Sequence, residues 1–229
     1  NKKDAIWFFF VGISYGYISY VAEAYALKYI SGLTVSVFYL ISPIISILIG
    51  YFLHKKSVHI SQLIVLAIGL AGCLIVFVNY KNGLADIGNF SFFPYFSLLI
   101  SITSSVASWH VATNLMKKGY WLITVNMYSY IVGGFLSLLT CIWSGNTTIS
   151  NPLLFAGTVS LLTLIANVIA FSLYSFLLKQ YSVTMVMFSS FLAPIIVVFI
   201  SSQNPITTIN ITALFAFIVG LYLYGKLES

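Results

Sequence analysis

Eight long apolar stretches divide this sequence, and they limit its fold more than any other feature. Each has about 20 residues with almost no charge, the length that a helix needs to cross a bilayer. The stretches cover residues 5–27, 33–53, 60–80, 93–116, 120–143, 152–178, 182–201 and 206–224. We therefore expect an all-α, polytopic membrane helix bundle with eight transmembrane helices.

The composition excludes most other classes of protein. Only 6% of the residues are charged, whereas a soluble domain carries about 25%. The net charge of +6 comes from scattered lysines that form no basic face long enough to follow a nucleic acid duplex. Cys73 and Cys141 lack the spacing of metal ligands and are predicted to be small core residues. We expect the lipid bilayer as a partner, with no nucleic acid, no metal and no cofactor.

The lysines indicate the orientation of the chain, because short cytoplasmic loops are enriched in Lys and Arg. With the N-terminus inside, eight lysines lie on the inner side and two, Lys28 and Lys81, on the outer side. The inner lysines are Lys2, Lys3, Lys55, Lys56, Lys117, Lys118, Lys179 and Lys226. This predicts an integral membrane protein with both termini in the cytoplasm. A composition rich in Lys, Ile, Asn and Phe but without Arg favours an AT-rich genome, often that of a host-associated bacterium, and we expect the protein in a bacterial inner membrane.

An internal repeat aligns two parts of the chain. At an offset of 151, eight of the 23 positions from 27 to 49 are identical to those from 178 to 200, among them a Lys, a Ser and a Pro. Five predicted spans separate the two copies, so the copies are expected to cross the membrane in opposite directions. Inverted repeats are typical of transporters whose central site opens alternately to each side.

The same offset predicts the domain organisation. The stretch that begins at residue 93 would start the second repeat, and its counterpart would precede residue 1 by about two helices. We expect residues 1–92 to hold the last three helices of the first repeat, with its first two helices missing. Residues 93–229 would hold the five helices of the second repeat. The parent protein would be a ten-helix (5+5) inverted-repeat transporter.

Short segments of both copies resemble a known family. Residues 25–31, 40–43 and 67–72 resemble the EamA-like domain of the drug/metabolite transporter superfamily, and residues 178–195 look like its partner half. The resemblance implies cytoplasmic termini and a central cavity for amino acids, nucleotide sugars or related solutes, and it leaves a homodimer open. Many relatives end helices four and nine with a Gly-Glu pair. Residues 53–56 and 201–204 lack this pair, so a role that rests on that acid does not carry over.

The first two stretches contain one set of candidate site residues. Glu23 is an acid inside an apolar stretch, where a charge is costly without a partner. It is either a site for a substrate amine or proton, or an interfacial carboxylate paired with Lys or Tyr. Tyr17, Tyr20 and Glu23 share a broad helix face, which predicts a polar aromatic wall unless the rings only pack. Tyr39 joins them in the predicted substrate-binding set.

Two other stretches supply the remaining candidates. Trp109, His110 and Asn114 form an aromatic and polar segment that resembles the family's segment in this helix. His110 could titrate near neutral pH and couple transport, or it could be a satisfied core histidine. Asn167 lies near the centre of its stretch, where its amide needs either solute or a neighbouring helix. We predict substrate-binding roles for these residues and no catalytic residue.

Prolines and glycines add two local predictions. Pro43 and Pro194 occupy matching positions of the repeat, where each should kink its helix. They are predicted hinge residues beside the cavity, unless the kinks are only inherited geometry. Gly12 to Gly16 fit the G-x-S-x-G pattern of hydrolases, but that pattern requires a strand, a turn and a helix. Within a helix, Gly12 and Gly16 instead predict close packing against a neighbour.

These features predict a secondary transporter and not an enzyme. It would move a small polar metabolite, such as an amino acid or a nucleotide-related solute, by alternating access. Because few titratable groups lie in the spans, exchange or facilitated diffusion is expected rather than proton pumping. The alternative is a non-transport integral membrane protein, either an intramembrane enzyme or a helical scaffold.

Overall fold

The computed structural model describes residues 2–55, 91–145 and 149–188, with single residues and pairs between 60 and 71 and after 191. All regular structure in these residues is helical, and five helices are long and apolar enough to cross a membrane. These five are Lys3–Ala26, Gly32–Leu53, Phe92–Lys117, Ile123–Ser144 and Pro152–Gln180. They match five predicted stretches to within a few residues. The stretches 60–80 and 206–224 lie largely outside the described residues, so the count of eight stays a prediction.

Three of these five spans are interrupted by segments with other helical hydrogen bonding. The first span consists of α1 (Lys2–Ile13), the π-helix η1 (Ser14–Ser19) and α2 (Tyr20–Ala26). The second span consists of α3 (Gly32–Phe38), the 3₁₀ turn η2 (Tyr39–Ile41) and α4 (Ser42–His54). The later elements are α7 (Phe92–Lys117), α8 (Leu122–Ser144), α9 (Pro152–Leu162), the π-helix η3 (Thr163–Ala170), α10 (Phe171–Gln180) and α11 (Val183–Phe188). A π-helix bonds residue i to i+5 and occurs often at functional sites.

The two copies of the sequence repeat share a local structure at the start of their second helix. Ser31 and Ser182 are both N-caps. The hydroxyl oxygen of Ser31 accepts a hydrogen bond from the amide of Thr34 at 3.2 Å, and that of Ser182 accepts one from the amide of Met185 at 3.1 Å. A serine at the N-cap satisfies an amide that would otherwise have no partner in the helix. The repeated serine therefore has the same structural role in both copies.

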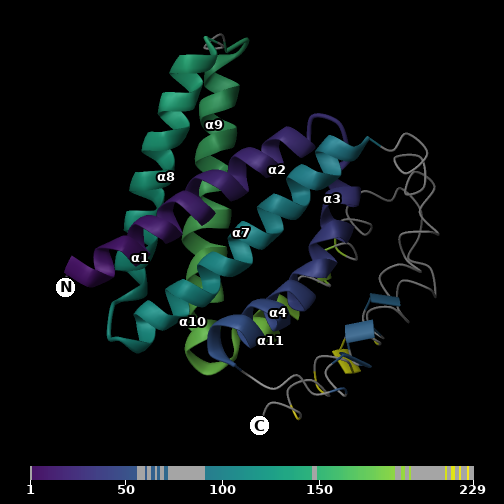
Figure 1. Ribbon diagram of the computed structural model, residues 1–229. Helices are drawn as coiled ribbons and strands as arrows, with labels where there is room; N and C mark the ends of the chain where they lie inside the picture. The colour runs from purple at the N-terminus through teal and green to yellow at the C-terminus, as the bar shows by residue number, and fades with distance from the viewer. Residues whose placement is uncertain are drawn as a thin grey trace.

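The first span lies between two neighbours. Figure 1 shows α1 and α2 lying along α7, and α1 and η1 also pack against α8. The second span packs against α7 through α4, and α4 in turn contacts α11. Since α4 and α11 belong to repeat-matched stretches, the two copies meet directly at this interface.

Serines hold the first span against α7. Ser14 Oγ donates to the carbonyl of Ser104 at 3.0 Å, and Ser97 Oγ donates to the carbonyl of Ala22 at 2.5 Å. A hydrogen bond between membrane helices contributes about 0.6 kcal/mol. Such bonds act together with the short side chains, which let the two helices approach closely.

Glycines bring the first span equally close to α8. A Cβ built on Gly16 would lie 2.4 Å from the carbonyl oxygen of Ser129, and one on Gly133 would lie 2.3 Å from the backbone of Gly16. A Cβ on Gly12 would lie 2.6 Å from Val132 Cβ. The predicted packing role of Gly12 and Gly16 is confirmed, since no larger side chain fits at this crossing.

The outer faces of the bundle are apolar. Trp143 on α8 and Leu153 on α9 are 93% and 86% exposed, and Cys141 on α8 is exposed as well. The prediction that Cys141 is a core residue is wrong, because this part of α8 faces away from α1 and α7. These exposed apolar side chains lie on helices long enough to cross a membrane.

Candidate functional site

A cavity of about 260 Å³ opens between the first span, the start of the second, α7 and the η3–α10 region. Its lining consists mostly of aromatic, small and hydroxyl-bearing side chains, with one carboxylate. The lining residues are Tyr15, Ser19, Tyr20, Glu23, Tyr39, Ser105, Trp109, Ala166, Ala170 and Tyr174. This combination of apolar rings and a few polar groups is typical of small-molecule sites.

Positions related by the offset of 151 line this cavity together. At the offset of 151, Tyr15 corresponds to Ala166, Ser19 to Ala170 and Glu23 to Tyr174, and all six line the cavity. The two π-helices correspond as well, since η1 maps onto residues 165–170 of η3. The wider π turn brings residues five apart, such as 15 and 20, onto one face, and both of these line the cavity. Three pairs of positions related by this offset thus line the cavity with different side chains.

Pro43 alters the backbone hydrogen bonding at Tyr39, a residue of the cavity lining. Proline has no amide hydrogen, so the carbonyl of Tyr39 loses the α-helical partner it would otherwise have four residues later. That carbonyl instead accepts a hydrogen bond from Ser42 Oγ at 2.6 Å, and the 3₁₀ turn η2 forms here. Pro194, the matching proline, lies outside the described residues, and the hinge role of both stays a prediction.

A chain of hydroxyl groups leads to Glu23. Tyr39 Oη donates a hydrogen bond to Glu23 Oε2 at 2.7 Å and lies 3.3 Å from Ser101 Oγ. Ser101 Oγ in turn lies 3.1 Å from Ser19 Oγ. Because the phenol has one hydrogen and gives it to the carboxylate, Ser101 donates to Tyr39 and Ser19 donates to Ser101. Among the described residues, no donor or cation reaches the other carboxylate oxygen, Oε1.

Aromatic rings form the rest of the wall. Trp109 packs against Tyr15 with ring centroids 5.4 Å apart and against Tyr174 at 4.8 Å. Tyr15 also contacts Tyr20 at 5.4 Å. These rings come from three spans, and edge and tilted contacts of this kind hold them in fixed orientations.

Four of the eight predicted binding residues meet in this cavity: Tyr20, Glu23, Tyr39 and Trp109. The structure places the others elsewhere. Tyr17 Oη accepts from Thr140 Oγ1 of α8 at 3.3 Å, and half-buried Asn114 is not part of the lining. The side chain of Asn167 lies outside what the structure describes. The binding roles of all eight stay predictions.

His110 lies in a different polar cluster. It is 5% exposed, and its Nε2 lies 3.0 Å from Ser46 Oγ, which in turn lies 3.0 Å from Thr184 Oγ1. The three residues come from α7, α4 and α11. This geometry agrees with the alternative of a satisfied core histidine, which here joins the two repeat-matched helices.

Six lining residues were not predicted: Tyr15, Ser19, Ser105, Ala166, Ala170 and Tyr174. An α-helical period places Tyr17 with Tyr20 and Glu23, but the π turn of η1 changes which residues share a face. The sequence repeat is a signal that identifies one of these six, because the offset of 151 relates Glu23 to Tyr174.

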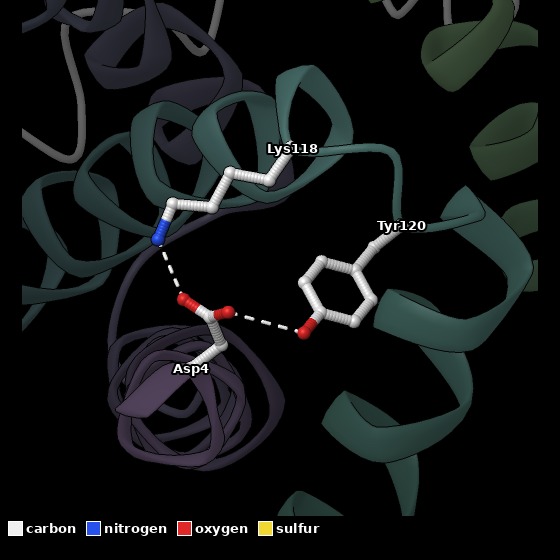
Figure 2. Close-up of polar contacts among 3 residues, drawn as sticks. All are labelled: Asp4, Lys118 and Tyr120. Carbon is white, nitrogen blue, oxygen red and sulfur yellow. Dashed lines mark hydrogen bonds and ion pairs between the residues drawn. The ribbon is translucent and has the colours of Figure 1, made fainter. Parts of the chain in front are cut away.

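A second acid is already paired. Figure 2 shows Asp4 of α1 between Lys118 and Tyr120, which lie in the connection from α7 to α8. Lys118 Nζ lies 2.5 Å from Asp4 Oδ1, and Tyr120 Oη donates to Oδ2 at 3.1 Å. Both carboxylate oxygens of Asp4 thus have partners. Where the structure describes the chain, no three His, Cys, Asp or Glu residues are grouped as metal ligands would be.

Comparisons with known proteins give relatives of one kind. Residues 1–78 match the model of the EamA-like transporter family. Proteins named S-adenosylmethionine/S-adenosylhomocysteine transporter, from Chlamydia trachomatis serovars L2 and D, are each 24% identical over 188 residues, which is 78% of this chain. The chain spans 57% of the length of these two relatives. The corresponding protein of Chlamydia muridarum is also 24% identical.

One crystal structure has the same fold, with a TM-score of 0.71 at 16% identity. The match covers 98% of this chain and 78% of that chain. The matched family and the relatives are transporters by name, and the five apolar helices support an integral membrane protein. The family resemblance seen in the sequence is thereby confirmed: this chain carries the pattern of the EamA-like transporter family over residues 1–78.

Proposed function

We propose that the protein containing this chain is a secondary transporter that moves a small polar metabolite across a bacterial inner membrane by alternating access. The cavity between matched positions of the two copies is the observation that carries this proposal. In a carrier built from inverted repeats, the solute binds where the repeats meet. The three matched pairs in the lining support such a site here.

The solute class follows from the relatives and from the lining. We propose an adenosylated sulfur amino acid of the kind named for the chlamydial proteins. Aromatic side chains offer faces on which a purine or a cationic group can lie. Glu23 supplies a negative charge for a positive group of the solute. The lining therefore suits a molecule that is both aromatic and charged.

Exchange of two such solutes is the expected mode of transport. Complete protein is reconstituted in liposomes filled with unlabelled S-adenosylhomocysteine, and labelled S-adenosylmethionine is added outside. We expect the labelled solute to accumulate without any proton gradient, because the described part of the cavity offers Glu23 as its single acid. Uptake that depends strictly on a proton gradient would refute exchange, and no uptake under either condition would refute the solute class.

The orientation of the two copies is a separate prediction. In a variant without native cysteines, Lys28→Cys should react with a membrane-impermeant maleimide applied outside intact cells. Lys179→Cys should react only after the membrane is opened, like the inner control Lys117→Cys. Both tested side chains are exposed, so accessibility does not limit the reaction. Labelling of residues 28 and 179 from the same side would contradict the inverted arrangement.

A further inference from the structure

Glu23 has one carboxylate oxygen that no described residue pairs. Its Oε2 accepts the Tyr39 phenol at 2.7 Å, while Oε1 has no donor or cation among the described residues. A charged group within a membrane span is costly unless it pairs or faces a cavity. Since Glu23 lines the cavity, a cation that enters there is the partner that would satisfy it.

The neighbouring rings favour a particular kind of cation. Tyr15, Tyr20, Trp109 and Tyr174 line the same cavity as Glu23. Aromatic rings attract cations through their faces, and aromatic cages are typical of sites for methylated cations. A methylated onium group has no hydrogen-bond donors of its own. It therefore loses little when aromatic faces surround it in place of oxygen acceptors.

The size of the cavity limits which part of a solute it holds. Its 260 Å³ lie below the lower end of the range for ligand pockets, about 300 Å³. The described walls therefore enclose a head group better than a whole adenosylated molecule. Ala166 and Ala170 also line this space, and their small side chains occupy little of it.

We propose that this cavity is a methyl-onium site, in which Glu23 and the surrounding rings bind the positively charged methylsulfonium of S-adenosylmethionine. The inference rests on the proposed function and adds a basis for selectivity. S-adenosylhomocysteine lacks the methyl group and has a neutral thioether sulfur in its place. Both solutes carry the same α-ammonium and carboxylate groups, so only the sulfonium distinguishes their charges.

The test uses Glu23→Gln, which keeps an oxygen to accept the Tyr39 hydrogen bond but removes the charge. Uptake of labelled S-adenosylhomocysteine by the complete protein in liposomes is measured with each unlabelled solute as competitor. The variant should raise the inhibition constant of S-adenosylmethionine about tenfold, because it loses the charge of a partly desolvated cation site. The constant for S-adenosylhomocysteine should change less than about threefold.

Two further variants make the result decisive. Asp4→Asn removes the other acid of the first span, which is paired with Lys118, and should leave the ratio of the two constants unchanged. Tyr174→Leu removes a ring from the opposite wall and should weaken S-adenosylmethionine selectively by about threefold to fivefold. It supplies the readout if Glu23→Gln does not fold.

The outcomes separate this inference from the proposed function. If wild-type protein takes up neither solute, the proposed function is wrong. If wild-type protein exchanges both solutes and Glu23→Gln weakens both equally, Glu23 faces the shared α-ammonium and the methyl-onium site is wrong. An equal loss with Tyr174→Leu would lead to the same conclusion.

Discussion

Replacing Ala166 by Trp is expected to lower the exchange of both adenosylated solutes by about 100-fold or more, equivalent to about 2.7 kcal/mol. Ala166 and Tyr15, which are related by the offset of 151, both line the cavity, and the small side chain of Ala166 leaves space there. An indole at this position would fill much of the 260 Å³ between them. Exchange rates in liposomes, normalised to the amount of folded protein, measure the effect.

Val168→Trp provides the matched control on the same π-helix. Val168 is 53% exposed and does not line the cavity, so an indole there should extend away from it. We expect exchange within about twofold of the wild type, because surface substitutions of this kind change little. Equal exchange by Ala166→Trp and the wild type would mean that the cavity is not on the route of the solute.

The spans could be predicted from the sequence because the bilayer sets their length. Residues 93–116 were predicted as a span, and α7 runs over Phe92–Lys117. Hydropathy alone could not reveal the π-helix η1 or the 3₁₀ turn before Pro43. Those features depend on which backbone carbonyl finds a partner, as the Ser42 hydrogen bond to Tyr39 illustrates.

Some residues of the cavity could be predicted because their side chains are unusual within an apolar span. Glu23 was found because a charge in an apolar span requires an explanation, and Trp109 because a large polar aromatic lies deep in a helix. Ala166 and Ala170 carry no chemical signal of their own. Their small side chains matter because they leave space in the cavity. In the sequence, only the offset of 151 relates them to Tyr15 and Ser19.

The residue type of His110 does not by itself predict its role. A histidine in a membrane helix is compatible with proton coupling or with a structural hydrogen bond. Its position 3.0 Å from Ser46 and its burial between α4, α7 and α11 identify the partner that the sequence could not. Partners from distant parts of the chain are fixed by packing and not by local pattern.

Replacing Gly133 by Ala should destabilise the protein by about 3 kcal/mol, at the upper end of the usual cost of overpacking. The new Cβ would lie 2.3 Å from the backbone of Gly16, and a backbone atom cannot rotate away as a side chain can. Gly134→Ala is the matched control, since a Cβ there meets nothing within 4 Å. It should be neutral or stabilising by up to about 1 kcal/mol, the gain in helix propensity. Unfolding in detergent by denaturant measures both.

The same substitution should also reach the cavity. Gly16 lies in η1 between Tyr15 and Ser19, so moving its backbone away from α8 displaces two lining residues. We expect Gly133→Ala to lower exchange about tenfold even at temperatures where it remains folded, whereas Gly134→Ala should leave exchange unchanged. Normal exchange by folded Gly133→Ala would show that η1 can shift without altering the site. The π-helix would then be a consequence of close packing and not a part of the binding geometry.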